Sequence, residues 1–186
     1  GLGTGTLAAY GEPKDVIRFY EINPLVEKLA RTEFTYLADC RGNVEIVLGD
    51  GRLSLENEPA QHYDLLVVDA FNGDAIPVHL LTRQSMELYF RHLKPTGILA
   101  LHLTNTHLDL AQVTKVLAQY LGKQSLFVTN PAGEDWNISA SLWALVSSER
   151  IALPSATAAT RAWDAVARPD LRVWTDDYNN LFQILR

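Results

Sequence analysis

Two acids follow a run of apolar residues in the stretch YDLLVVDAFNGDAIP at residues 63–77. The apolar residues at 65–68 are typical of a buried strand, and Asp69 follows them directly. A carboxylate at the end of a strand could take a proton from an amine nucleophile, or hold that amine by its charge. Asp74 could anchor a cationic substrate, and Phe71, between the two acids, is a candidate for substrate contact. The structural alternatives are a helix or loop cap for Asp69 and a solvated loop acid for Asp74.

A glycine-rich stretch, GLGTGT, opens the chain and contains Gly1, Gly3 and Gly5. Glycine tolerates positive φ and lets the backbone approach a ligand closely, although many such stretches are plain turns. Glu21 ends an apolar segment about 20 residues later, which is the spacing at which an acid binds ribose hydroxyls. Glu21 could also be an acid that only flanks a helix, but together with the glycines it favours a nucleotide site.

A third polar stretch, GDGR, follows the next short apolar segment and contains Asp50 and Gly51. A carboxylate there could accept a hydrogen bond from an exocyclic amine such as that of adenine. Asp-Gly is also a common dipeptide of tight turns, so a purely structural role is the alternative.

The elements that must position these residues alternate between apolar and amphipathic segments, which predicts an α/β fold with a largely parallel sheet. The predicted strands cover residues 16–22, 44–48, 64–69, 97–103, 125–130 and 141–148, of which the last two pair antiparallel at a sheet edge. The predicted helices cover residues 23–34, 82–93, 109–121 and 156–167. The segments at 65–68 and 98–103 are apolar on both faces, so we expect them in central strands. Because ligands bind beyond the carboxyl ends of parallel strands, the glycines and the acids are expected along one edge of the sheet.

The composition favours one soluble domain, with 186 residues, 47% of them hydrophobic and 20% charged. A net charge of -6 and a pI of about 5.3 argue against a nucleic-acid partner. Cys40 is the only cysteine, which excludes an intramolecular disulfide and favours a reducing, cytoplasmic setting. No apolar run is long enough to cross a bilayer, so no membrane contact is predicted for the chain itself.

Several other kinds of site find no support in the sequence. The five histidines form no HExxH motif and no Cys/His ligand pairs, so no metal site is predicted. The chain has no Gly-x-Ser-x-Gly elbow and no P-loop lysine, which argues against hydrolases and nucleoside triphosphatases. His79 lies just past the acidic loop and could reach a site, whereas His102 lies in an apolar segment and is interpreted as a core histidine.

Four stretches in order, GLGTGTLAAYG, FYEINP, GDGR and YDLLVVDAFNGDAIPVHLLT, resemble the spermidine synthase-like group of class I S-adenosylmethionine-dependent transferases. The chain looks most similar to the branch in which this domain follows membrane-spanning segments, and the tail WTDDYNNLF resembles the end of that branch. The resemblance implies a Rossmann-like sheet and a cofactor that is S-adenosylmethionine or its decarboxylated form. The three glycines then match the cofactor loop and Glu21 the acid that binds the ribose. Asp50 matches the adenine-side acid, and Asp69 matches the acid that assists deprotonation of a diamine.

The chain also departs from the pattern of the aminopropyltransferases. Thr4 stands where these enzymes usually carry an Asp, and the acidic loop is longer, which displaces Asp74. The family's N-terminal β-rich segment and the first strand of its core have no counterpart here. We therefore expect a single transferase-type domain, residues 1–186, that is N-terminally incomplete and whose sheet splits or exposes unpaired edges. These departures bear on the polyamine substrate more than on the cofactor.

The favoured hypothesis is a transferase that moves an aminopropyl group to a polyamine. A methyltransferase with the same cofactor and another acceptor is an alternative. A nicotinamide-dependent oxidoreductase is less favoured, because position 6 is not a glycine. A non-catalytic ligand-sensing or assembly module of the same fold is a further alternative. We expect a cytoplasmic domain, alone or as the soluble part of a longer membrane-attached protein, and a homodimer stays open.

Overall fold

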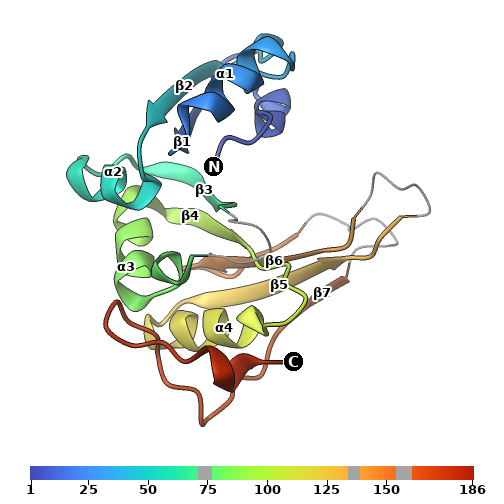
Figure 1. Cartoon of the computed structure of the whole chain (residues 1–186). Helices are drawn as coiled ribbons and strands as arrows, with labels where there is room; N and C mark the ends of the chain where they lie inside the picture. The colour runs from blue at the N-terminus through green and yellow to red at the C-terminus, as the bar shows by residue number, and fades with distance from the viewer. Residues whose placement is uncertain (71–76, 134–138, 154–160) are drawn as a thin grey trace. The chain divides into compact units, whose positions relative to one another are not determined.

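The computed structural model describes residues 1–70, 77–133, 139–153 and 161–186 (Figure 1). The chain splits into two compact units, an N-terminal unit, Gly1–Glu58, and a C-terminal unit, Pro59–Arg186. The single domain expected from the sequence stays a prediction.

The N-terminal unit is built around two parallel strands, β1 (Val16–Glu21) and β2 (Asn43–Leu48). The 3-10 helix η1 (Thr6–Tyr10) precedes these strands, α1 (Pro24–Thr32) connects them, and α2 (Gly51–Asn57) follows them. α1 begins where the sequence predicts, because the Asn23 side chain accepts a hydrogen bond from the Leu25 N–H and Pro24 opens the first turn. α2 is not among the predicted helices. The unit packs around a small core of Leu2, Ala8, Phe19 and Ala30.

The C-terminal unit contains one sheet with the strand order β3-β4-β6-β5-β7. β3 and β4 are parallel, and β6 pairs antiparallel with both β4 and β5, so β3, β4 and β5 point in one direction. These strands are β3 (Tyr63–Val68), β4 (Leu93–His102), β5 (Gln124–Asn130), β6 (Ser141–Ser147) and β7 (Arg161–Trp163). The predicted α/β fold and the antiparallel pairing of β5 with β6 are confirmed, and the sheet is divided in two as expected.

Helices and the C-terminal tail cover this sheet. α3 (Arg83–His92) packs on β4, and α4 (Leu110–Tyr120) packs on β5 and β6. Two 3-10 helices complete the unit, η2 (Val78–Leu80) and η3 (Leu181–Ile184), and η3 packs on α4 (Figure 1). The fully buried side chains between these layers include Leu99, Leu101, Leu117, Phe127 and Trp174.

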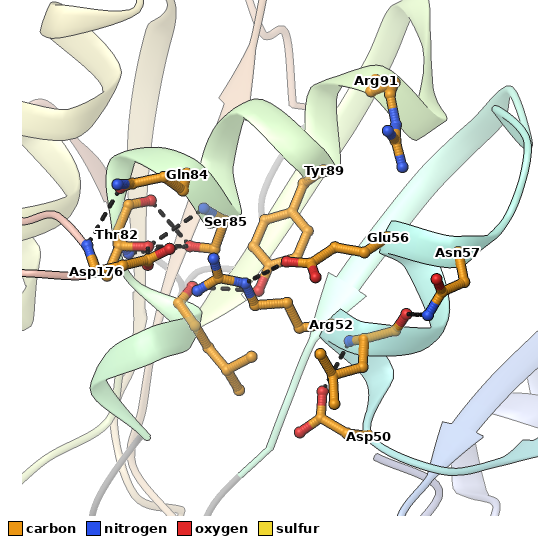
Figure 2. A network of polar contacts seen from close by, with 12 residues as sticks. Asp50, Arg52, Glu56, Asn57, Thr82, Gln84, Ser85, Tyr89, Arg91 and Asp176 are labelled. Atoms are coloured by element: carbon orange, nitrogen blue, oxygen red, sulfur yellow. Dashed lines mark hydrogen bonds and ion pairs between the residues drawn. The ribbon is translucent and has the colours of Figure 1, made fainter.

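The tail is tied to the first turn of α3. The Thr82 hydroxyl donates to Oδ1 of Asp176 at 2.7 Å and accepts from the Ser85 N–H at 3.2 Å (Figure 2). The Asp176 N–H donates to Oε1 of Gln84 at 3.2 Å, and the Arg83 N–H donates to the carbonyl of the neighbouring Trp174 at 2.8 Å. The C-terminal tail therefore satisfies one backbone N–H of the first turn of α3 and holds the side chain of its N-cap residue.

Two sequence-based expectations are wrong in the described residues. Of the predicted helix at 156–167, residues up to 160 lie outside the described residues, whereas 161–163 form β7 and 164–167 are not helical. Trp163 lies opposite Phe127 of β5, with ring centroids 5.0 Å apart, and this pairing outweighs the local helix propensity. Leu65, expected to be covered on both faces, lies on the edge strand β3 and is 55% exposed.

Candidate functional site

Glu21 lies at the end of β1 and is only 8% exposed. Its Oε2 accepts from the Leu2 N–H at 3.0 Å, and its Oε1 accepts from the Asn23 N–H at 2.9 Å. Since each carboxylate oxygen offers two acceptor sites, each oxygen keeps capacity for a further donor such as a ribose hydroxyl. The carboxylate thus joins the glycine-rich stretch to the beginning of α1 while it stays chemically suited to a nucleotide.

The glycine-rich stretch contains two residues with positive φ, Gly3 at 54° and Gly5 at 83°. A Cβ at Gly3 would find no heavy atom within 4 Å, so this backbone borders open space that a ligand could enter. A Cβ at Gly5 would lie 2.8 Å from Cδ2 of Leu37, so Gly5 is required for packing. Gly1 is exposed. The open space beside Gly3, together with the acceptor capacity of Glu21, fits an adenosyl cofactor.

Asp50 is the N-cap of α2 rather than part of an isolated tight turn. Its Oδ1 accepts from the Leu53 N–H at 2.9 Å (Figure 2). Gly51 is the first helical residue, and a Cβ there would lie 3.3 Å from Cβ of Tyr20, so α2 and β1 approach each other closely. Asp50 therefore has a structural role, and its contact with adenine stays a prediction.

Asp69 directly follows β3 and forms a hydrogen bond with a histidine of the neighbouring strand. Its Oδ1 lies 2.8 Å from Nδ1 of His102, and Nε2 of His102 lies 2.7 Å from Oγ1 of Thr104. The Thr104 hydroxyl in turn accepts from the Leu142 N–H at 2.9 Å. The Asp69 side chain is 42% exposed and that of His102 is 21% exposed, so the carboxylate reaches solvent while the ring lies behind it.

His102 is a candidate site residue rather than the core histidine that the sequence suggests. Its ring stacks on Trp143, with centroids 4.5 Å apart and planes inclined by 8°. The signal that could have identified His102 is strand register. Val68 pairs with Leu101, so Asp69 and His102, one residue further along each parallel strand, must be neighbours.

A cavity of about 780 Å³ in the C-terminal unit adjoins Thr104. Residues that follow β4, residues at the end of β5 and residues at the beginning of β6 line it together with two arginines. Its lining residues are Thr104, Asn105, Thr106, Thr129, Asn130, Pro131, Ala140, Ser141, Leu142, Arg161 and Arg186. Most of these side chains carry hydroxyl, amide or guanidinium groups, but more apolar than polar surface faces the cavity.

Two of the remaining predicted site residues, Phe71 and Asp74, lie outside the described residues, whereas His79, in η2, is exposed. Among the residues that the structure describes, no group of three or more His, Cys, Asp and Glu side chains could hold a metal ion. In the same residues no helix is both long and apolar enough to cross a membrane.

Sequence comparison finds similarity to a curated enzyme. The chain is 32% identical over 111 residues to a polyamine aminopropyltransferase from Vibrio vulnificus (strain CMCP6), a match that covers 57% of this chain and 36% of that protein. The chain thus spans little more than a third of the length of this relative. No family model matches the chain.

Solved structures of spermidine synthases have a similar fold. A probable spermidine synthase from Corynebacterium glutamicum ATCC 13032 matches 88% of this chain and 64% of its own, with 18% identity and a TM-score of 0.66. A spermidine synthase in complex with the transition-state analogue AdoDATO matches 80% of this chain and 53% of its own, with 16% identity and a TM-score of 0.56. The spermidine synthase-like fold of class I S-adenosylmethionine-dependent transferases is therefore confirmed for this chain.

Proposed function

We propose that the chain is part of a transferase that uses an adenosyl-sulfonium cofactor and transfers an aminopropyl group to a polyamine. The observation that carries this proposal is the buried Glu21 carboxylate, which holds the Leu2 N–H and keeps acceptor capacity beside an open glycine backbone. The similarity to a polyamine aminopropyltransferase supports the choice of aminopropyl transfer over other reactions of this fold.

Residues of the N-terminal unit would hold the cofactor. Gly3 leaves room for it, Glu21 would accept the ribose hydroxyls, and Asp50 with Gly51 would lie on the adenine side. When bound, the adenosyl sulfonium supplies an alkyl group on a positively charged sulfur, which is a good leaving group. The chain's own contribution is to orient this group and to exclude water, and positioning of this kind accounts for much of the acceleration of such reactions.

Asp69 of the C-terminal unit would act on the acceptor. An amine acceptor must lose a proton to expose its electron pair, and an exposed carboxylate at a strand end can receive it. The proposed role of Asp69 is therefore that of general base, with Asp74 and Phe71 as proposed substrate contacts.

Calorimetric titration tests the cofactor. The purified chain is titrated with S-adenosylmethionine, with its decarboxylated form and with NAD, and Glu21→Ala is titrated in parallel. We expect a sulfonium form to bind, with an affinity reduced at least about tenfold in the variant, which corresponds to about 1.4 kcal/mol. Preference for the decarboxylated form supports aminopropyl transfer, whereas preference for S-adenosylmethionine would favour methyl transfer. Binding of NAD alone would refute the proposal.

A further inference from the structure

The hydrogen bonds around Asp69 have one consistent direction when Asp69 is ionised and the His102 ring is neutral. An ionised carboxylate is only an acceptor, so Nδ1 of His102 must carry the hydrogen that lies between the two groups. In a neutral ring Nε2 is then an acceptor and needs a donor. The Thr104 hydroxyl is that donor, because one of its lone pairs is already occupied by the Leu142 N–H while its own hydrogen stays available.

We propose that His102 is a positioning residue for Asp69 and that Thr104 fixes the tautomer of its ring. The hydrogen bond that Nδ1 of His102 donates to Oδ1 of Asp69 orients the carboxylate. Oδ2 is then left for the amine that accepts the transferred group. The acceptor nitrogen then loses a proton to Oδ2: one N–H bond breaks, one O–H bond forms, and the electron pair stays on nitrogen. This inference rests on the proposed function, since it assumes that Asp69 receives a proton from an acceptor amine.

The surroundings of the ring support a positioning role. His102 lies directly opposite Trp143 in the β4–β6 pairing, and the parallel stacking of the two rings restricts rotation of the imidazole. The Leu142 N–H holds Thr104 at the beginning of β6, so the whole chain of donors is anchored to the sheet. Hydrogen bonds that run in one direction polarise each other, which strengthens the bond that reaches Asp69.

Two substitutions of His102 separate the hydrogen bond from the packing. His102→Phe keeps an aromatic ring on Trp143 but removes the donor, whereas His102→Asn places an amide N–H close to the position of Nδ1. With decarboxylated S-adenosylmethionine and a diamine such as putrescine, we expect His102→Phe to lower kcat about 10- to 100-fold while cofactor affinity stays unchanged. His102→Asn should recover most of this loss. Equal activity of His102→Phe and the wild type would overturn the proposal.

Nuclear magnetic resonance of the ring nitrogens tests the same geometry without turnover. In the full chain at neutral pH, we expect a protonated Nδ1 and an unprotonated Nε2 for His102. Thr104→Val should weaken this preference, and Thr104→Ser, which keeps the hydroxyl, serves as the control. A ring protonated at Nε2 overturns the positioning of Asp69 even in an active enzyme. A wild-type chain that binds cofactor but transfers to no acceptor overturns the proposed function instead.

Discussion

A Glu21→Gln variant keeps the size of the buried side chain at the end of β1 but changes its hydrogen-bonding groups. The carboxylate accepts from the Leu2 N–H through one oxygen and from the Asn23 N–H through the other. An amide offers a single acceptor oxygen, so one of the two backbone N–H groups must face an NH₂ group. The substitution therefore removes one bond to a charged acceptor and weakens the other.

The magnitude follows from these two bonds. A hydrogen bond to a charged group contributes about 1.5–3 kcal/mol, and a neutral one about 0.5–1.5 kcal/mol. Losing one of the two backbone hydrogen bonds and turning the other from a charged into a neutral one should destabilise the N-terminal unit by about 2–4 kcal/mol. Since Glu21 is 8% exposed, water can do little to satisfy the orphaned N–H.

Urea unfolding followed by two signals measures this effect. The four tryptophans, at positions 136, 143, 163 and 174, all belong to the C-terminal unit, whereas circular dichroism reports on both units. We expect the free energy of unfolding from circular dichroism to fall by about 2–4 kcal/mol. Glu27→Gln is the matched control, because Glu27 only pairs with Arg31 on the surface of α1 at 2.9 Å, and such a pair contributes about 0.3–0.5 kcal/mol. A Glu21→Gln variant as stable as this control would refute the stabilising role of the two backbone hydrogen bonds to Glu21.

Substitutions at Gly3, Gly5, Thr82 and Asp170 test other parts of the structure. Gly3→Ala should cost only about 1 kcal/mol for its positive φ, but should weaken the binding of S-adenosylmethionine in calorimetry. Gly5→Ala should destabilise the chain more than Gly3→Ala, because its added Cβ would also lie 2.8 Å from Cδ2 of Leu37. A larger loss of stability in Gly3→Ala would contradict the assignment of Gly5 to packing and of Gly3 to the ligand space. Thr82→Val removes the cap of α3 and should lower the free energy of unfolding by about 1 kcal/mol in tryptophan-monitored urea titrations, whereas Thr82→Ser should not. Arg168 beside Asp170 lowers the pKa of that carboxyl below 3.8, so the pair's contribution to stability is present above this pH and is lost as the pH falls through the lowered pKa. The thermal midpoint of Asp170→Asn should therefore differ from that of the wild type near neutral pH and converge with it in acid. A constant difference would refute the role of the pair.

The fold was largely predictable because local signals and tertiary pairing agree in most elements. Asn23 and Pro24 mark the beginning of α1, and Gly122, with φ of 64°, follows the end of α4. The exceptions are α2, which the sequence analysis does not predict, and the segment at 161–163, where the surrounding alanines favour a helix but cross-strand pairing with β5 produces a strand. Propensity is a weak signal, and a sheet edge can override it.

The site was only partly predictable because its key contact joins residues far apart in the sequence. The ends of apolar runs identify Glu21, Asp50 and Asp69 as candidate acids. Glu21 ends β1, Asp69 directly follows β3, and Asp50 is the N-cap of α2, while their functional roles stay predictions. The hydrogen bond from His102 to Asp69 depends on the register between β3 and β4, which periodicity does not determine. Because the register is not visible in the sequence, His102 in its apolar strand has the sequence pattern of a core residue.

The two strand-end acids have opposite surroundings, and this contrast argues for a division of roles. Glu21 is buried and bound by two backbone N–H groups, which hold its oxygens in place as fixed acceptors. Asp69 is 42% exposed, and its contact is with a side chain, His102, rather than with the backbone. A ribose hydroxyl needs an acceptor that does not move, whereas a reacting amine needs a carboxylate that can receive a proton. The surroundings therefore favour Glu21 for binding and Asp69 for chemistry. Two single variants test this division. Glu21→Asp, which shortens the side chain, should reduce cofactor affinity, and Asp69→Glu, which lengthens it, should reduce kcat.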